Sequence, residues 1–215
     1  MCFASISTLR VVSIPELKSD YDVPIINLTE VEISSPGTWQ AEFIEGQLID
    51  YRYFDHFNIT VLYEFGFGLS YTTFDIERSL SIESIESLAS NVTARPDPNA
   101  QILPGGNVEL WAPVLRLSTG VKNIEAVAGA TVVQLYLSFP DTAPAGTPKQ
   151  VLRGFSKVLL QPGESIGVSF ELLRRDVSLW DVESQTCMNS AGEVEFRVGF
   201  SSRDVVQTIT ISLVD

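Results

Sequence analysis

The sequence predicts a mainly β protein: an antiparallel β-sandwich that follows a less regular stretch. Two observations carry this prediction. Apolar and polar residues alternate along several segments of the second half, and Pro- and Gly-containing turns separate those segments. The composition agrees, since 215 residues with 45% hydrophobic and 19% charged side chains can fold around a core and are not typical of a disordered chain.

Four segments of the second half each present one apolar face, with polar residues on the other face. They span residues 131–138, 164–172, 192–200 and 205–214. One face for a core and one for water is the habit of antiparallel sheets. The positions expected to face the core are Val133, Leu135 and Leu137; Ile166, Val168, Phe170 and Leu172; Val194, Phe196, Val198 and Phe200; and Ile209, Ile211 and Leu213.

Turn residues separate these segments. Gln161-Pro-Gly-Glu164 predicts a type II turn, and Pro104-Gly-Gly-Asn107 opens a further strand region up to residue 118. Residues 140–148 are rich in Pro, Gly and Ala and predict a loop. The segment 174–181 predicts a single helical turn with Asp176 as its cap.

The first part of the chain lacks long periodic runs. Residues 1–62 contain three scattered prolines and only one short strand candidate, Leu48–Phe54. The glycine- and aromatic-rich stretch that follows, near residues 65–73, is the natural boundary. We therefore expect two parts, 1–70 and 71–215, with residues 1–18 matching nothing that can be placed.

The chain is strongly acidic, with a formal net charge of −13. Such a surface repels nucleic acid and anionic membranes, so neither is expected as a partner. No apolar run approaches the roughly 20 residues of a membrane span. The first ten residues lack a basic start and make a poor secretory signal.

Three Asn-x-Thr sequons, at Asn27, Asn58 and Asn91, point instead to the secretory pathway and are candidate glycosylation sites. The two cysteines, Cys2 and Cys187, are too few for a metal site, and whether they pair stays open. We expect no cofactor and no metal.

Glycosidases need two carboxylates that face one sugar bond, and Asp50, Asp55 and Glu64 are candidates by composition. On one straight strand Asp50 and Asp55 would point to opposite faces, so we favour solvated side chains or ion pairs with Arg52. His56 is the only histidine. With no nucleophile motif elsewhere, a surface position is favoured over a triad.

The stretch around Gly66-Phe-Gly68 lacks the further residues of a phosphate-binding loop, so glycine here predicts close backbone approach. The aromatic residues around it can stack on sugars, but core and interface packing is favoured. They are Tyr51, Tyr53, Phe54, Phe57, Tyr63, Phe65, Phe67, Tyr71 and Phe74. Arg–Asp neighbours in 174–176 and 201–204 predict turns with local ion pairs.

Several stretches, in order along the chain, resemble the carboxy-terminal portion of fungal glycoside hydrolase family 3 β-glucosidases. They include Ile49-Asp-Tyr-Arg-Tyr-Phe-Asp55, Tyr63-Glu-Phe-Gly-Phe-Gly-Leu-Ser-Tyr-Thr-Thr-Phe74, Ala128–Pro140, Pro148–Val158, Leu160–Ser165 and Glu195–Asp204. The chain departs from the family pattern at Ile124-Glu125, Cys187 and Val194, where the family usually has Thr-Gly, Trp and Tyr.

The resemblance implies a fibronectin type III-like (immunoglobulin-like) β-sandwich over residues 71–215. Residues 1–70 would be the tail end of an α/β-sandwich domain. The family's nucleophile lies in an amino-terminal (β/α)8 barrel and its acid/base lies in the α/β domain, both upstream of the matched region. No catalytic residue is therefore carried over, and the chain alone is expected to be inactive.

The role that the resemblance implies is structural: packing on the (β/α)8 and α/β domains of a secreted enzyme that hydrolyses terminal β-D-glucosides in cellulose degradation. The β-glucoside substrate would be met only through those domains. The alternative is an independent carbohydrate-binding or adhesive β-sandwich module, which the aromatic cluster motivates. A degenerate gene product that barely folds is a third reading.

Overall fold

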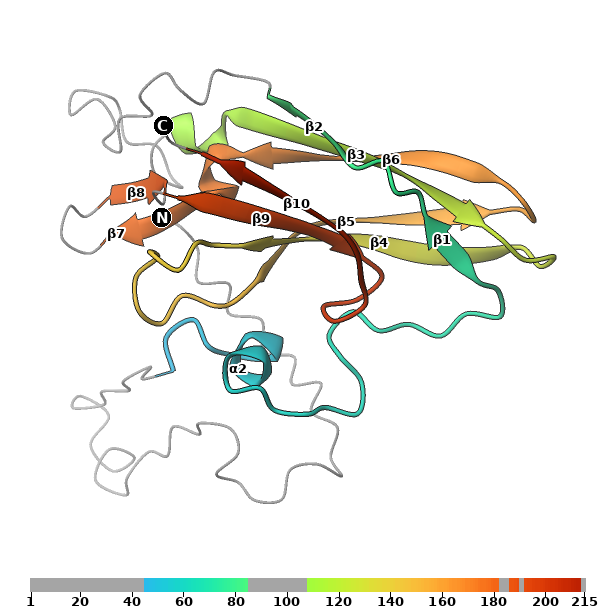
Figure 1. Ribbon diagram of the computed structural model, residues 1–215, viewed down its shortest axis with the longest axis horizontal. Coiled ribbons are helices and arrows are strands. Elements are labelled where there is room, and N and C mark those ends of the chain that lie inside the picture. Colours follow the sequence, from blue (N-terminus) through green and yellow to red (C-terminus); the bar gives the residue numbers. More distant parts are fainter. Residues whose placement is uncertain (1–44, 85–107, 182–185, 190–191, 214–215) are drawn as a thin grey trace, which may run out of the picture.

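The computed structural model describes residues 45–84, 108–181, 186–189 and 192–213, and these form two antiparallel sheets packed face to face (Figure 1). Asn27, Asn91, Cys2, the unplaced residues 1–18 and the turn at 104–107 lie outside the described residues. The mainly β fold is confirmed.

The first sheet is built around β3 (Pro113–Asn123). Along one edge of β3 lie β1 (Phe74–Ile76) and β2 (Ser81–Ser84), one after the other, and along its other edge lies β6 (Ser165–Leu173). All three pairings are antiparallel. This sheet has polar and small residues on its outer face, including Ser118 and Gly120 of β3 opposite Ser169 and Gly167 of β6.

The second sheet has the order β10-β9-β4-β5. Its strands are β4 (Gly129–Ser138), β5 (Val151–Leu160), β9 (Glu193–Gly199) and β10 (Val205–Ser212). A two-stranded ribbon of β7 (Ser178–Asp181) and β8 (Thr186–Asn189) lies at one end. Two 3-10 turns, η2 (Val108–Trp111) and η3 (Arg174–Asp176), complete the elements of the sandwich.

The core lies between the two sheets and follows the predicted alternation. Val133, Leu135 and Leu137 of β4 are fully buried, as are Val194, Phe196 and Val198 of β9. One predicted core residue differs: Ile166 is 43% exposed, because it is the second residue of β6 and lies next to the turn at the end of the sandwich.

The turn Gln161–Glu164 is confirmed and carries the chain from one sheet to the other. The Glu164 amide donates to the Gln161 carbonyl over 3.1 Å, and Gly163 has a φ of 74°, the left-handed conformation that a type II turn requires at its third residue. Strands β5 and β6, neighbours in sequence, therefore belong to opposite layers of the sandwich.

The predicted helical turn at 174–181 exists as η3, but its N-cap residue is Leu173 and not Asp176. Asp176 sits at the third helical position, where its carboxylate accepts the Leu173 amide hydrogen over 2.9 Å. A carboxylate there reaches back to the amide that opens the turn.

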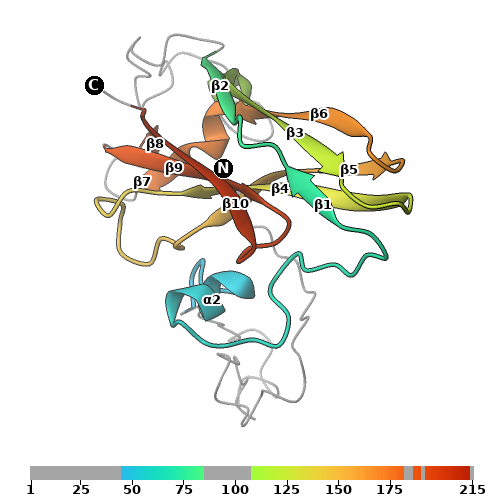
Figure 2. The ribbon, with the colours of Figure 1, turned by 45° about the vertical axis from the view of Figure 1, so that its right-hand side comes forward.

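The strand predicted for Leu48–Phe54 is wrong: Tyr51–His56 form a short helix, α2, beneath the second sheet (Figure 2). Asp50 caps it by accepting the Arg52 amide hydrogen over 3.4 Å. A helix places Tyr51 and Asp55, four residues apart, on one face, and both contact the sandwich. Because both residues must contact the sandwich from one face, this segment forms a helix and not a strand.

Asn123, at the end of β3, ties three parts of the sandwich together. Its amide nitrogen donates to the carbonyls of Val127 (2.7 Å) and Leu160 (3.2 Å). Its amide oxygen accepts from the Thr72 hydroxyl (2.9 Å) and the Glu125 backbone (3.1 Å). The side chain is fully buried, and its bonds to Thr72 and Leu160 are buried as well.

We predict that Asn123→Ala lowers the free energy of unfolding by about 2–4 kcal/mol, because it leaves buried partners without a hydrogen bond. Urea denaturation followed by tryptophan fluorescence measures the loss. The neighbouring exposed substitution Lys122→Ala is the control and should change stability by less than about 0.5 kcal/mol. Equal effects of the two substitutions would contradict the role assigned to Asn123.

Candidate functional site

The candidate site is the surface where residues 45–72, here called the leading segment, lie on the outer face of the second sheet (Figure 2). Tyr51 of α2 is the central contact. Its hydroxyl accepts the Leu152 amide hydrogen over 2.8 Å, which ties the helix to β5. Its ring stacks on Phe65 with centroids 4.4 Å apart and meets Tyr136 of β4 edge-on at 6.2 Å.

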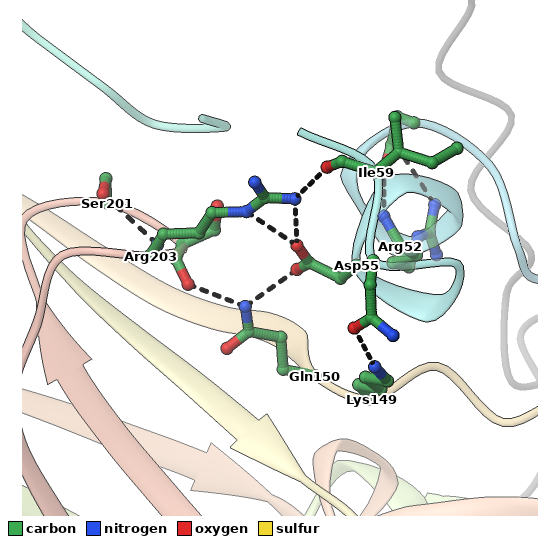
Figure 3. A network of polar contacts seen from close by, with 10 residues as sticks. Arg52, Asp55, Ile59, Lys149, Gln150, Ser201 and Arg203 are labelled. Carbon is green, nitrogen blue, oxygen red and sulfur yellow. Dashed lines mark hydrogen bonds and ion pairs between the residues drawn. The ribbon is translucent and has the colours of Figure 1, made fainter. Parts of the chain in front are cut away.

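Asp55 is the hub of a polar network between α2 and the sandwich (Figure 3). Its carboxylate pairs with the Arg203 guanidinium, with 3.0 Å between Oδ1 and Nη2, and accepts from the Gln150 amide over 2.9 Å. Arg203 also donates to the Ile59 carbonyl (2.9 Å), and Gln150 donates to the Ser202 carbonyl (2.7 Å). The Asp55 side chain is only 11% exposed.

This network corrects two expectations. Asp55 does not pair with Arg52, which bonds Asp50 instead over 3.4 Å. Arg203 does not pair locally with Asp204, because its side chain reaches Asp55, 148 positions earlier in the sequence. The expected turn at residues 201–204 does form, with the Phe200 amide bonded to the Asp204 carbonyl over 3.0 Å.

A second group of contacts fixes the chain after α2. Ser201 donates its hydroxyl to Glu64 (2.8 Å), and the Ser202 amide donates to the Phe65 carbonyl (2.9 Å). The Gln134 amide nitrogen donates to the Gly66 carbonyl over 3.0 Å. The leading segment is thus held by the Gln134 side chain of β4 and by the Ser201 side chain and Ser202 backbone of the β9–β10 turn.

Gly66 is required by this close approach. A Cβ at position 66 would collide with the Gln134 side chain, and the backbone has a φ of 82°, where glycine is favoured. Close approach at this glycine is therefore confirmed. The partner at this glycine is the side chain of Gln134.

Burial changes the acidity of the two tyrosines in the site. It raises the pKa of the Tyr51 hydroxyl above the ordinary value of 10.0, and it raises the pKa of Tyr136 further. The neighbouring Tyr51 adds to the effect on Tyr136. The Tyr136 hydroxyl donates to the Gln134 amide oxygen over 2.6 Å, a bond that only the neutral phenol can make.

The structure gives each candidate catalytic residue a contact of its own. Asp50 caps α2, Asp55 bonds Arg203 and Gln150, and Glu64 accepts from Ser201. His56 is half-buried, with its ring 4.8 Å from that of Phe57. The described residues contain no group of three or more acidic, His or Cys side chains arranged for a metal ion.

The aromatic cluster divides between packing and exposure. Tyr51 is buried, as predicted for packing, but several other large apolar residues of the leading segment are exposed. They are Phe57, Leu62, Tyr63, Phe65, Phe67, Leu69 and Tyr71. Phe155 and Leu159, on the outer face of β5, are also exposed at 69% and 68%.

In the part of the chain that the structure describes, no helix is long and apolar enough to cross a membrane.

The sequence did not single out Gln134 or Gln150, and for Arg203 it predicted only a local ion pair. Polar residues alternate with apolar ones along β4, and the position of Gln134 is the one that normally faces water. Its 3% exposure follows from the leading segment, which lies over this strand. Gln134 could have been identified from the sequence only by predicting that the leading segment lies over β4.

We predict a coupling free energy of about 1 kcal/mol between Asp55 and Arg203 in a double-mutant cycle of Asp55→Ala and Arg203→Ala. Chemical denaturation of the four proteins measures it. The matched control is Arg116–Glu171, an ion pair of 3.2 Å whose side chains are 46% and 49% exposed, with a coupling below about 0.5 kcal/mol. Equal coupling free energies in the two ion pairs would contradict the prediction that the Asp55–Arg203 pair is the stronger one.

We also predict a loss of stability in alkali. Because the folded-state pKa values of Tyr51 and Tyr136 lie above 10.0, the stabilisation is complete below pH 10 and falls as the pH rises further. The slope is up to about 1.4 kcal/mol per pH unit for each tyrosine. Urea denaturation between pH 9 and 11 measures it, and Tyr51→Phe and Tyr136→Phe should each flatten it. If the dependence of stability on pH is unchanged in both variants, the loss of stability in alkali does not come from these tyrosines.

Comparisons with known proteins show which family and which relatives this chain is similar to. The fibronectin type III-like domain family matches residues 131–202. A relative named "Probable beta-glucosidase G" from Aspergillus oryzae is 55% identical over 194 residues, which are 90% of this chain and 23% of the relative. Its namesake in Emericella nidulans is 50% identical over the same lengths. The chain therefore spans about a quarter of the length of these curated relatives.

Solved structures agree. Beta-D-glucoside glucohydrolase from Trichoderma reesei matches with a TM-score of 0.69 and 40% identity, over 84% of this chain and 25% of that one. A beta-glucosidase from Chaetomella raphigera matches with a TM-score of 0.70 and 39% identity, over 80% and 23%. By sequence and by fold, the chain is homologous to the carboxy-terminal region of glycoside hydrolase family 3 β-glucosidases and contains a fibronectin type III-like domain.

Proposed function

We propose that this chain is a carboxy-terminal fragment of a β-glucosidase, non-catalytic in itself, which stabilises the catalytic domains by packing against them. The parent reaction is hydrolysis of terminal β-D-glucosides in extracellular polysaccharide breakdown. The observation that carries the proposal is that all three candidate carboxylates already bond other groups of the chain. Asp50, Asp55 and Glu64 each bond a neighbour. A glycosidase needs two that face a sugar bond.

The distribution of exposed apolar side chains supports docking on one side. The outer face of the first sheet carries side chains such as Arg116, Ser169 and Glu171. The outer face of the second sheet carries Phe155 and Leu159, and the leading segment on that side exposes most of its aromatic rings. A large exposed apolar patch marks an interaction surface.

The position of Phe155 joins these apolar residues into one region. Phe155 lies directly opposite Gln134 across the β4–β5 pair, and Gln134 bonds Gly66 of the leading segment. Directly opposite residues share a sheet face, so Phe155 adjoins the docked segment. We propose this region as the surface that meets the catalytic domains, with the domain division near residues 70 and 71.

A second candidate function is an independent carbohydrate-binding module. The rings of Tyr63 and Phe67 lie 5.1 Å apart and are exposed at 64% and 43%. Exposed aromatic rings can stack on sugar faces. This reading requires affinity for cello-oligosaccharides in the chain alone, whereas the structural reading requires none.

We predict that the purified 215-residue chain neither hydrolyses an aryl β-glucoside nor releases heat on titration with cello-oligosaccharides. Turnover that vanishes in Asp50→Asn, Asp55→Asn or Glu64→Gln variants would overturn the structural role. Saturable sugar binding that is lost in a Tyr63→Ala variant would favour the second candidate instead.

The docking surface is tested in a chimera in which residues 45–215 replace the matching part of the A. oryzae relative. We expect an active enzyme whose half-life at raised temperature falls at least about fivefold on Phe155→Asp, since a buried unpaired charge costs several kcal/mol. Ser169→Asp, on the outer face of the first sheet, is the matched control and should leave the half-life unchanged. Equal half-lives for both variants would place the docking surface elsewhere.

A further inference from the structure

We propose that Arg153, on the edge strand β5 close to α2, is the point at which the docking surface receives a carboxylate side chain of the catalytic domains. The inference rests on the proposed function, and it names the chemistry of the partner at one position of that surface. Three features of Arg153 support it: its place in the strand, the state of its guanidinium group and the charges around that group.

Arg153 is an extra residue in the pairing of β5 with β4. Gly154 lies opposite Leu135. Two positions earlier, Leu152 lies opposite Tyr136, which directly follows Leu135 in β4. Such a bulge leaves its extra residue unpaired and re-aims the side chain, most often at the edge of a sheet. Because β5 is the last strand of its sheet, the Arg153 side chain lies at an edge that another protein surface can reach.

The Arg153 guanidinium has no hydrogen bond or ion pair to the described residues. Its Nε atom is buried and lacks a partner, and its central carbon lies 5.9 Å from the centroid of the Phe139 ring. The residue as a whole is half-buried, and of its three nitrogens only Nε is buried without a partner. The two Nη atoms at the tip of the side chain therefore remain open to a group that approaches from outside.

The nearest acidic residue, Asp176, does not neutralise this charge. Its carboxylate accepts the Leu173 amide hydrogen over 2.9 Å and lies 3.9 Å from the Arg175 guanidinium. Burial lowers the pKa of the Arg153 guanidinium, and the charges of Arg175 and Arg52 lower it further. Asp176 acts in the opposite direction, but its effect is smaller than that of burial. A cation that is partly out of water and has no counter-charge is costly.

The two neighbouring arginines already have partners. Arg52 bonds Asp50 over 3.4 Å. Arg175 lies over the Trp111 ring, with its central carbon 3.8 Å from the ring centroid. Such a stack satisfies the face of a guanidinium group. Arg153 is thus the member of this group whose tip still lacks a partner among the described residues.

A carboxylate of the opposing domain fits this position. A guanidinium group bonds both oxygens of a carboxylate at once, which a single carbonyl oxygen cannot reproduce. Phe155, two positions along β5 and therefore about 7 Å away, is 69% exposed and belongs to the docking surface. A surface that covers Phe155 also covers the Arg153 tip and removes its remaining water, so it must bring a counter-charge. With a net charge of −13, the chain repels membranes and nucleic acid as sources of that charge.

The first test compares Arg153→Met in two settings. In the full 215-residue chain it should leave the melting temperature unchanged within about 1 °C or raise it, because it removes a charge without a partner and keeps most of the side-chain volume. In the chimera it should shorten the half-life at raised temperature at least about fivefold, because it leaves the opposing carboxylate covered and unpaired. Lys122→Met, on the exposed face of the first sheet, is the matched control and should change neither value.

Either of two results overturns the proposal. A melting temperature of the chain alone that falls by more than about 1 °C would show that Arg153 has its partner within the chain. An unchanged half-life of the chimera would show that no carboxylate meets it. The Phe155→Asp chimera separates this failure from that of the proposed function, since a shortened half-life there keeps the docking surface even when Arg153→Met has no effect.

The second test identifies the partner directly. Arg153→Lys places a primary amine at this position in the chimera, and a water-soluble carbodiimide joins an amine to a carboxylate in contact with it, with loss of one water. We expect peptide mapping to find residue 153 linked to an Asp or Glu that precedes the exchanged region. A link to Asp176, or no link at this position, contradicts the proposal.

Discussion

Two polar side chains on the outward face of β4, Gln134 and Tyr136, set the condition on which the rest of the structure depends. In an isolated sandwich this face would meet water, yet Gln134 is 3% exposed and Tyr136 is fully buried. Buried polar groups must find hydrogen-bond partners. They find them in each other and in the carbonyls of Gly66 and Phe200, so the strand and the leading segment stabilise each other.

The leading segment therefore packs on the sandwich as an outer layer. The Tyr51 ring and the Asp55 network fix α2, and the bonds to Glu64, Phe65 and Gly66 fix the chain behind it. The exposed apolar side chains of this layer have no cover in the described part of the chain. The layer thus contacts the sandwich through hydrogen bonds and the Tyr51 ring, while most of its other aromatic rings are exposed, as expected of an interaction surface.

The same arrangement brings two acidic residues that look catalytic, Asp55 and Glu64, into contact with the sandwich. Asp55 and Arg203 are separated by nearly the whole sandwich in sequence but meet where α2 docks. Pairing at that joint neutralises the carboxylate and positions the turn after β9.

The sequence by itself determined the sandwich. Alternation along β4, β6, β9 and β10, and the Pro-Gly turn at 162–163, are local signals that repeat with the period of a strand. It also carried the family resemblance through the motifs around residues 49–74 and 128–204. Which residues form the core could be read in advance, because one face of each strand is consistently apolar.

Only the tertiary structure decided that Leu48–Phe54 does not form a strand, that Gln134 is buried and that Arg203 reaches Asp55. Each of these depends on which surface lies over which. The aromatic run at 51–57 fits a strand or a helix equally well until Tyr51 and Asp55 are required to face the same sheet. A contact between residues about 150 positions apart leaves no periodic trace in a sequence, so its partners become visible only when the layers are assembled.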